Sequence, residues 1–226
     1  MWTEAERWPR DRPRAGNTKT TGHVLFVMAR GRHRDRLLDE GLRLFAQRGF
    51  AGTGVQEIAD AGGIPKGSFY NYFASKDEFG VAVVERYGAC SCQEMAAALS
   101  GSGSPIERLK AAFRRHDDAL VASGFAGGCL AGRLAQELAG EQPVFRAPLE
   151  KIFREQRRLV ADLLAQAAAA GEIAAVSDVE TLAGFLLSAW QGAMLRAKAA
   201  GSARPLEEFH AITFARLLAP PIPAAR

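Results

Sequence analysis

Apolar residues recur every three or four positions along almost the whole chain after Arg34, and this spacing constrains the fold more than any other feature. In the first such stretch the apolar side consists of Leu37, Leu38, Gly41, Leu42 and Phe45. That period matches the 3.6 residues per turn of an α-helix, and no segment alternates apolar and polar residues over the length of a strand. We therefore predict an all-α fold of about nine helices.

Turn and capping signals predict where these helices begin and end. A first helix from about residue 34 ends at Gly49, which suits a left-handed C-cap. Thr53, Ser75 and Ser177 each precede a Gln or Glu by three positions, which is the spacing of a capping box at a helix start. After short helices over 55–61 and 65–72, we predict helices over 76–99, 106–123, 130–139, 144–170, 179–200 and 206–218.

Charge is unevenly distributed along the 226 residues. Residues 1–76 contain 13 Lys and Arg against 8 Asp and Glu, whereas the remainder contains 16 against 17. A basic N-terminal part is typical of a protein that binds a polyanion, although a solvated basic surface gives the same pattern. The two parts of the chain are therefore expected to have different roles.

Several classes of protein are excluded by composition. No apolar run approaches the roughly 20 residues that a membrane-spanning helix requires, and no signal-peptide pattern precedes the first helix. Three cysteines, Cys90, Cys92 and Cys129, cannot build a disulfide framework in a chain of this length. We expect a cytoplasmic protein with no membrane partner.

The most informative segment, TGVQEIADAGGIPKGSFYNYFASK, begins at Thr53. Its two short helices are joined by a turn in which Gly63 can adopt the positive φ that a sharp turn requires, which predicts a helix-turn-helix. The second helix, over 65–72, would be about 10 to 12 Å long and would fit a DNA major groove. The small core between the helices would consist of Ile58, Ile64 and Phe69.

Polar residues of this segment have the chemistry of DNA contacts. Side chains suited to base edges are Lys66, Ser68 and Asn71. Groups suited to phosphate oxygens are the hydroxyls of Tyr70 and Tyr72 and the charge and backbone amide of Lys76. The candidate DNA-binding set also includes Gln56, Thr53 and Gly67, and at Gly67 the backbone can approach the DNA closely. The alternative is an ordinary αα-hairpin in which Tyr70, Tyr72 and Phe73 are core aromatics.

Residues 37–78 closely resemble the DNA-binding domain of the TetR/AcrR family of bacterial transcriptional regulators. The resemblance rests on FAQRGF, VQEIADAGGIPKGSFYNYF and SKDEF, while Gly54 and Pro65 depart from the family's usual residues. It implies a homodimeric repressor whose N-terminal three-helix domain binds a palindromic operator in double-stranded DNA and whose C-terminal domain binds a small-molecule inducer. We accordingly expect a disordered or artefactual extension over 1–27, the DNA-binding domain over 28–76, the inducer-binding and dimerisation domain over 77–219 and a flexible tail over 220–226.

Other chemistries lack the patterns that they need. Cys129, His116 and Asp117 could serve a cysteine hydrolase, but no nucleophile elbow or strand scaffold accompanies them. Cys90 and Cys92 would point about 200° apart on one helix, which chelates a metal poorly. The sequence contains no P-loop, the glycine-rich motif that would indicate a bound nucleotide. We expect no enzyme activity, metal or cofactor, and the alternative to a ligand-responsive repressor is a helical module that binds only other proteins.

The last two predicted helices carry the candidate dimer interface. Gly184, Ser188 and Gly192, spaced four residues apart, form a smooth stripe that lets another helix approach closely. Phe209 and Phe214 of the final helix add apolar area, and a two-fold dimer through these helices is what the family resemblance implies. Packing of the same residues against the chain's own core is the alternative.

Candidate inducer-binding residues combine apolar side chains with a few polar groups, as ligand pockets do. They are Tyr87, Phe113, His116, Gln136, Gln156 and Trp190, and core packing is the alternative for each aromatic residue.

Cys129 is a candidate sensor of electrophiles or oxidants. It opens the segment CLAGRLAQEL, which looks like the branch of the family that responds to small reactive or unsaturated metabolites. At the start of a helix, unpaired amides and the positive end of the helix dipole favour a thiolate, and His116 of the preceding helix could approach the sulfur. The alternative is a structural cysteine that behaves as a small hydrophobe.

Overall fold

The computed structural model describes residues 22–175 and 177–219. Within these ranges the chain forms nine α-helices and no strand, so the predicted all-α fold is confirmed. The chain divides into two compact units inside helix α4, with Val83 the last residue of the N-terminal unit and Val84 the first of the C-terminal unit. No helix of the described ranges combines the length and hydropathy needed to cross a membrane.

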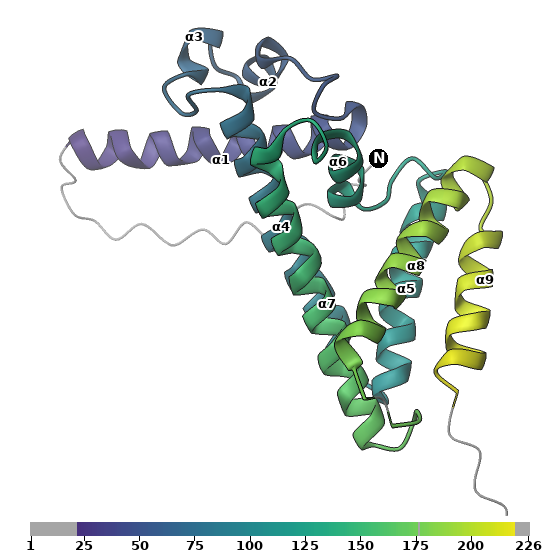
Figure 1. The fold of residues 1–226 in the computed structure, drawn as a ribbon. Coiled ribbons are helices and arrows are strands. Elements are labelled where there is room, and N and C mark those ends of the chain that lie inside the picture. The colour runs from purple at the N-terminus through teal and green to yellow at the C-terminus, as the bar shows by residue number, and fades with distance from the viewer. Residues whose placement is uncertain (1–21, 176, 220–226) are drawn as a thin grey trace, which may run out of the picture. The chain divides into compact units, whose positions relative to one another are not determined.

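The N-terminal unit is built around a cluster of phenylalanine rings. Its elements are α1 (Gly22–Arg48), α2 (Val55–Gly62), α3 (Lys66–Phe69) and the first two turns of α4 (Lys76–Leu99) (Figure 1). The rings that form the cluster are Phe45, Phe50, Phe69, Phe73 and Phe79, and contacting pairs have centroids 5.0 to 5.9 Å apart. Each ring is almost completely removed from water, which is the main source of stability in so small a unit.

Two glycines allow the helices of this unit to lie close together. A Cβ atom at Gly41 of α1 would lie 2.5 Å from the ring of Phe79, and one at Gly62 of α2 would lie 2.5 Å from a methyl group of Leu37. Real Cβ contacts are not this short, so α1 meets α4 and α2 at positions where only glycine fits.

The start of α1 and the division between the units differ from the sequence-based expectation. Helix α1 begins at Gly22 rather than near Arg34, and it therefore includes 22–27, which were predicted to be disordered. Since no proline follows Pro13 before Pro65, nothing in the sequence stops the helix from extending upstream. Residues 1–21 and the predicted tail over 220–226 lie outside the described residues. The division falls at Val83 rather than 76 because the first turns of α4 pack into the N-terminal core.

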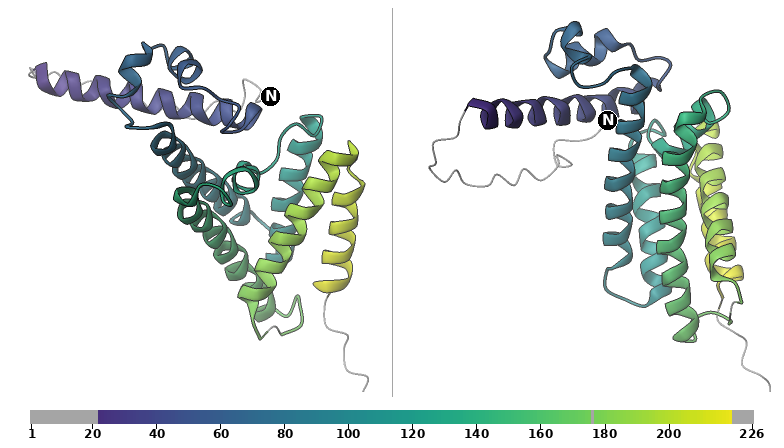
Figure 2. Two further views of the ribbon diagram at one scale, coloured as in Figure 1. Left: turned by 45° about the horizontal axis from the view of Figure 1, so that its top comes forward. Right: turned by 60° about the vertical axis from the view of Figure 1, so that its left-hand side comes forward.

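The C-terminal unit consists mainly of long helices, of which α7 contacts both α5 and α8; the right-hand view of Figure 2 shows these three side by side. Its elements after α4 are α5 (Pro105–Ala122), α6 (Leu130–Leu138), η2 (Pro143–Phe145), α7 (Arg146–Ala169), α8 (Val179–Ala200), α9 (Arg204–Ile212) and η3 (Thr213–Leu217). The predicted helices over 76–99 and 179–200 coincide with α4 and α8. The predicted helix over 144–170 is divided between the 3₁₀ turn η2 and α7, and that over 206–218 ends in the π-helical turn η3.

Only one of the three predicted capping boxes caps its helix as expected. Ser75 Oγ accepts a hydrogen bond of 3.0 Å from the backbone N–H of Glu78 at the start of α4. At α2 the N-cap is Gly54 instead, because the Thr53 hydroxyl donates to the carbonyl of Gly49 at 2.7 Å. At α8 the N-cap is Asp178, whose carboxylate accepts from the backbone N–H of Thr181 at 2.9 Å, one residue later than predicted.

A buried polar network ties three helices of the C-terminal unit together. Asp117 of α5 accepts a 2.8 Å hydrogen bond from Nε1 of Trp190 on α8, and its other oxygen lies 2.6 Å from Nε2 of His210 on α9. Asp117 and His210 are each 6% exposed. Because both oxygens of Asp117 have partners, this polar side chain is accommodated in an otherwise apolar core.

Candidate functional site

The turn between α2 and α3 has the geometry that its glycines predict. Gly63 adopts a left-handed conformation with φ of +68°, and its N–H donates to the carbonyl of Asp60 at 3.1 Å. Ile58 and Phe69 are fully buried and Ile64 is 9% exposed, so the small core predicted for the motif is confirmed. The helix-turn-helix therefore forms as the sequence indicates.

Helix α3 is shorter than the two turns predicted over 65–72. It covers only Lys66–Phe69, after which the N–H groups of Asn71 and Tyr72 donate to the carbonyls three residues earlier, at 3.1 and 2.9 Å. These tighter bonds turn the chain so that Phe73 enters the aromatic core, where it is 1% exposed. The predicted α-helical length was wrong because burial of Phe73 overrides continuation of the helix.

The polar side of α3 and its following turns faces solvent. Lys66, Gly67 and Asn71 are exposed and Tyr70 is 53% exposed, while Ser68 and Tyr72 are half-buried. A Cβ atom at Gly67 would meet nothing within 4 Å, so the backbone there is open to close approach. In the hairpin alternative both tyrosines would be core residues, whereas of the three aromatics proposed for that core Phe73 alone is buried.

Residues at the edges of this surface are more constrained. Gln56 Nε2 donates to Asp60 Oδ1 at 2.7 Å, so a base contact from Gln56 requires this pair to open. The ammonium group of Lys76 lies 4.2 Å from the ring centre of Phe50. Thr53 is fully buried and donates inward, so its assignment to the DNA-binding set is corrected: its hydroxyl does not face solvent.

The candidate inducer-binding residues do not form one site. Phe113, His116 and Trp190 belong to the core of the C-terminal unit, where they border a void of only about 10 Å³. Burial lowers the pKa of His116 below its usual value, with Glu94 and Asp117 opposing that shift. A void of this size holds about one water molecule, so core packing accounts for these three side chains.

Tyr87 and Cys129 form a separate contact. The Tyr87 hydroxyl donates to Cys129 Sγ at 3.7 Å and accepts from the backbone N–H of Leu130 at 3.3 Å. Cys129 is the half-buried N-cap of α6, and its sulfur also accepts from the N–H of Gly132 at 3.4 Å. Burial, with the nearby Cys129, raises the pKa of Tyr87 well above its usual value. The partner of the thiol is thus Tyr87 rather than His116, which packs edge-on against Trp190.

Gln136 and Gln156 lie in a third place, an open groove of about 540 Å³ between α6, α7 and α8. Sequence reasoning missed two further residues of this groove, Arg154 and Arg157 of α7. In the sequence of a long amphipathic helix, charged residues that line a groove have the same spacing as charged residues that face open solvent. These two arginines are recognised as groove residues only from the packing of α8 beside α7.

The candidate dimer residues are divided between the surface and the core. Ser188 and Gly192 of α8 are exposed and Gly184 is half-buried. Phe209 is 8% exposed with its ring centroid 5.5 Å from that of Phe113, and Phe214 is half-buried and stacks on His210. These two rings pack into the core of their own unit, because α9 turns its apolar side towards α5. Phe185, which sequence reasoning did not single out, is 59% exposed beside the stripe.

Comparison with known proteins gives consistent matches to both units. Residues 37–83 match the family model for bacterial regulatory proteins of the tetR family, and 105–213 match the tetracyclin repressor-like C-terminal domain. The transcriptional regulator AcuR of Cereibacter sphaeroides is 35% identical, covering 88% of this chain and 87% of that protein. The HTH-type transcriptional repressor DhaR of Mycobacterium sp. strain GP1 is 33% identical, covering 84% and 95% respectively.

Solved structures agree with these matches. The crystal structure of Escherichia coli NemR in its reduced form is 32% identical, with a TM-score of 0.75 over 84% of this chain and all of that one. Sequence identity above 30% over most of both chains, together with the helix-turn-helix and the helical C-terminal unit, assigns the family. The chain belongs to the TetR family of bacterial regulatory proteins.

Proposed function

We propose that this chain is a homodimeric transcriptional repressor that binds a palindromic operator and releases it when a small-molecule inducer binds. The observation that carries the proposal is the exposed polar surface of α3 and its following turns, which is held over a fully buried aromatic core. Relatives over most of the chain are named as transcriptional repressors. Because operator DNA lies in the bacterial cytoplasm, the same proposal includes the cytoplasmic location expected from the sequence.

Within this surface the residue types support a division of roles. Lys66, Ser68 and Asn71 would contact base edges in the major groove, while Tyr70, Tyr72 and Lys76 would contact phosphates and so fix the position of the motif. Gln56 would add a base contact on release from Asp60.

Dimerisation would set the spacing of the two binding surfaces. One short recognition element gives little affinity, whereas two in fixed register would bind half-sites about 34 Å apart, or more, along the DNA. The exposed apolar side chains Phe185 and Leu195 of α8 flank Ser188 and Gly192, which supports a contact of this face with a second copy. Mass photometry at micromolar concentration tests this contact, and a species of monomer mass alone would contradict it.

Capture of genomic DNA tests the proposal directly. The immobilised chain is mixed with sheared DNA of its source genome, and the bound fragments are sequenced. We expect enrichment of fragments that share one palindrome. Lys66→Ala and Asn71→Ala should each relax the sequence preference, and each should cost ~1 to 3 kcal/mol of binding free energy at the base whose contact is lost. Tyr70→Phe should weaken the binding of all DNA sequences alike, because a phosphate contact carries no sequence preference. Absence of any enriched palindrome would contradict the proposal and favour a module that binds proteins.

We also propose that Cys129 responds to electrophiles. Its thiol is half-buried at the N-terminus of α6 and accepts hydrogen bonds from Gly132 and Tyr87. With N-ethylmaleimide the sulfur would add to the carbon–carbon double bond of the reagent, and the thiol proton would move to the neighbouring carbon. Release by such an inducer would correspond to a coupling of about 1 to 3 kcal/mol, or about 5- to 150-fold in operator affinity.

Alkylation of variants tests the role of this thiol. Cys129→Ser should bind the operator normally and should no longer be released by N-ethylmaleimide. Cys92→Ser is the matched control, since burial raises the pKa of the Cys92 thiol, with Glu155 adding to the shift, and this disfavours the reactive thiolate. Release of Cys129→Ser by the reagent, or indifference of the unaltered chain, would contradict the role.

A further inference from the structure

The helix-turn-helix motif carries no net charge of its own. Residues 53–76 contain two cations, Lys66 and Lys76, and two carboxylates, those of Glu57 and Asp60. Much of the affinity of a protein for duplex DNA comes from positive side chains that neutralise phosphates, whatever the sequence of the bases. The motif can therefore supply base contacts, but tight binding requires positive charge from an adjacent element.

Helix α1 carries positive charge in the segment that precedes the aromatic core. Arg32, Arg34 and Arg36 occupy every second position, with His33 and Asp35 between them, and all five residues are exposed. Three guanidinium groups against one carboxylate give this segment an excess of positive charge. The following stretch, 37–52, contains two arginines and two carboxylates, so it adds nothing to that excess.

Two of these arginines lie near opposite ends of α3. A Cβ atom at Gly63, in the turn before α3, would lie 3.3 Å from Nη1 of Arg36. The guanidinium carbon of Arg34 lies 5.2 Å from the ring centre of Phe73, four residues after the end of α3. Figure 1 shows α2 and α3 on the same side of α1. The charge of α1 is thus continuous with the proposed DNA-binding surface.

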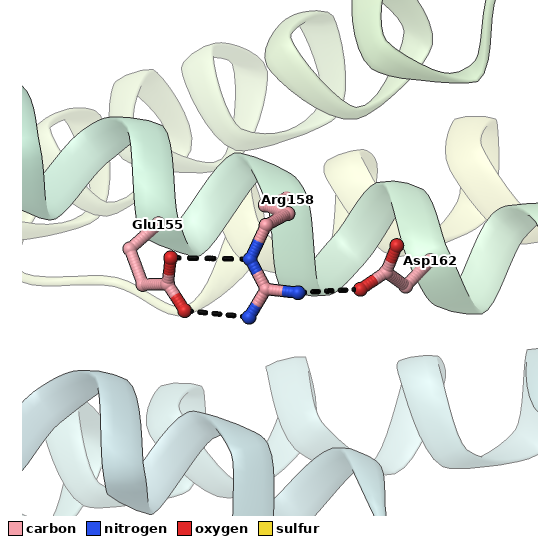
Figure 3. A network of polar contacts seen from close by, with 3 residues as sticks. All are labelled: Glu155, Arg158 and Asp162. Atoms are coloured by element: carbon pink, nitrogen blue, oxygen red, sulfur yellow. Dashed lines mark hydrogen bonds and ion pairs between the residues drawn. The ribbon is translucent and has the colours of Figure 1, made fainter.

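Arg34 and Arg36 differ from arginines whose charge is already neutralised within the protein. Arg158 of α7 is an example of the latter, because its guanidinium lies between Glu155 at 2.7 Å and Asp162 at 2.9 Å (Figure 3). Among the residues that the structure describes, neither Arg34 nor Arg36 forms an ion pair with a carboxylate. Their charges are therefore available to a polyanion.

We propose that Arg34 and Arg36, with Arg32 one turn before Arg36, bind phosphates of the DNA backbone beside the half-site that α3 contacts. A guanidinium group can donate two parallel hydrogen bonds to the oxygens of one phosphate. These contacts would add affinity without sequence preference and would position α3 in the groove. The position beside a half-site rests on the proposed repressor function, whereas the affinity of this segment for duplex DNA does not.

The salt dependence of operator affinity tests this contact. Arg36→Gln removes one charge from an exposed position and keeps a polar side chain. We expect the slope of log affinity against log salt concentration to become shallower by about 0.9 for each phosphate contact that is lost. Arg36→Lys retains the charge and should retain the slope. A slope that Arg36→Gln leaves unchanged would overturn the proposal.

Arg43→Gln is the matched control. Arg43 lies seven residues after Arg36, about two turns along the same face of α1, and its guanidinium pairs with Glu40 at 2.8 Å. The control changes the net charge by the same amount, and it should keep the slope of the unaltered chain. Equal changes of slope in Arg36→Gln and Arg43→Gln would overturn the proposal, because net charge alone would then explain the effect.

Arg34 has a structural alternative, because its guanidinium also covers the ring of Phe73. Arg34→Gln should make the salt slope shallower, as Arg36→Gln does. A role in covering the aromatic core alone would instead lower the free energy of unfolding in urea and leave the slope unchanged. That second result would overturn the assignment of Arg34.

Single neutral methylphosphonates in the operator locate the contacted phosphates. At the phosphate that Arg36 binds, the replacement should weaken binding of the unaltered chain and should have no further effect on Arg36→Gln. Elsewhere the replacement should affect both chains alike. Equal effects on the two chains at every phosphate would overturn the contact.

A duplex of arbitrary sequence separates this inference from the repressor proposal. Arg36→Gln should weaken binding to this duplex and to the operator, and the preferred palindrome should stay the same. An enriched palindrome with an unchanged salt slope in Arg36→Gln would uphold the repressor and overturn the role of α1. Binding to arbitrary duplexes that Arg36→Gln weakens, with no palindrome enriched, would uphold the role of α1 and contradict the repressor.

Discussion

Substitution of Gly67 should affect DNA binding without reducing the stability of the fold. Its Cβ position is open, its φ is not in the left-handed region, and alanine is the better helix former. We therefore expect Gly67→Ala to leave the free energy of unfolding unchanged or slightly raised, and to weaken operator binding because a methyl group would stand between the backbone and the DNA. Urea unfolding and fluorescence anisotropy with labelled operator measure the two effects.

Gly62→Ala is the matched control for this substitution. Its added methyl would lie 2.5 Å from the Leu37 side chain, so the cost should appear in folding, at about 1 to 3 kcal/mol as for other overpacked cores. Normal stability of Gly62→Ala, or normal operator affinity of Gly67→Ala, would contradict the packing and the DNA surface respectively.

Asp117 makes both hydrogen bonds of the buried polar network in the C-terminal unit. Asp117→Ala would leave Trp190 Nε1 and His210 Nε2 buried without their hydrogen-bond partner, and a buried polar group without a partner costs about 1 to 3 kcal/mol. Urea unfolding should show this loss, while Asp118→Ala, at the exposed neighbouring position, should change the free energy of unfolding by less than about 0.5 kcal/mol. Similar values for the two variants would contradict the network.

His116 should make the stability depend on pH. Burial lowers its pKa in the folded chain below the ordinary value of 6.5, so the unfolded chain binds a proton more readily. The free energy of unfolding should therefore be highest above pH 6.5 and should fall as the pH decreases from 6.5 through the lowered pKa. His116→Gln should remove this part of the pH dependence in urea unfolding at pH 8 and below 6.5. An unchanged pH dependence in the variant would contradict the assignment.

At the scale of elements, features fixed by local chemistry could be predicted from the sequence. The limits of α4 and α8 follow from apolar periodicity between turn signals, and the left-handed turn follows from Gly63. The exposure of Lys66 in α3 and of Asn71 in the turn that follows could be predicted in the same way, because these polar side chains have no apolar role. The helix-turn-helix could thus be predicted from local chemistry alone.

Features fixed by tertiary packing could not be predicted. Helix α3 ends early because Phe73 is drawn into the aromatic core, and Thr53 turns inward to the carbonyl of Gly49 instead of capping α2. Phe209 was expected on the dimer face, but its ring packs against Phe113 of α5. The groove lined by Gln136 and Gln156 depends on how the three consecutive helices α6, α7 and α8 pack together, so no local pattern indicates it.

For the whole molecule, one continuous helix links the two units. Helix α4 contributes Phe79 to the aromatic core of the N-terminal unit and, about two turns later, Tyr87 to the contact with Cys129 in the C-terminal unit. We propose that binding of the inducer moves this helix and so alters the separation of the two DNA-binding surfaces of a dimer. The reciprocal effect is required by linkage: operator DNA should weaken inducer binding by the same factor.

The dependence of operator affinity on salt tests the central claim most directly. Anisotropy of labelled operator is measured with the unaltered chain and with Lys76→Ala over a series of salt concentrations. The logarithm of the affinity should fall linearly with the logarithm of salt concentration, with a slope of about −0.9 per neutralised phosphate, and Lys76→Ala should make the slope shallower by about 1. An affinity that salt leaves unchanged, or no binding to double-stranded DNA at low salt, would contradict the account.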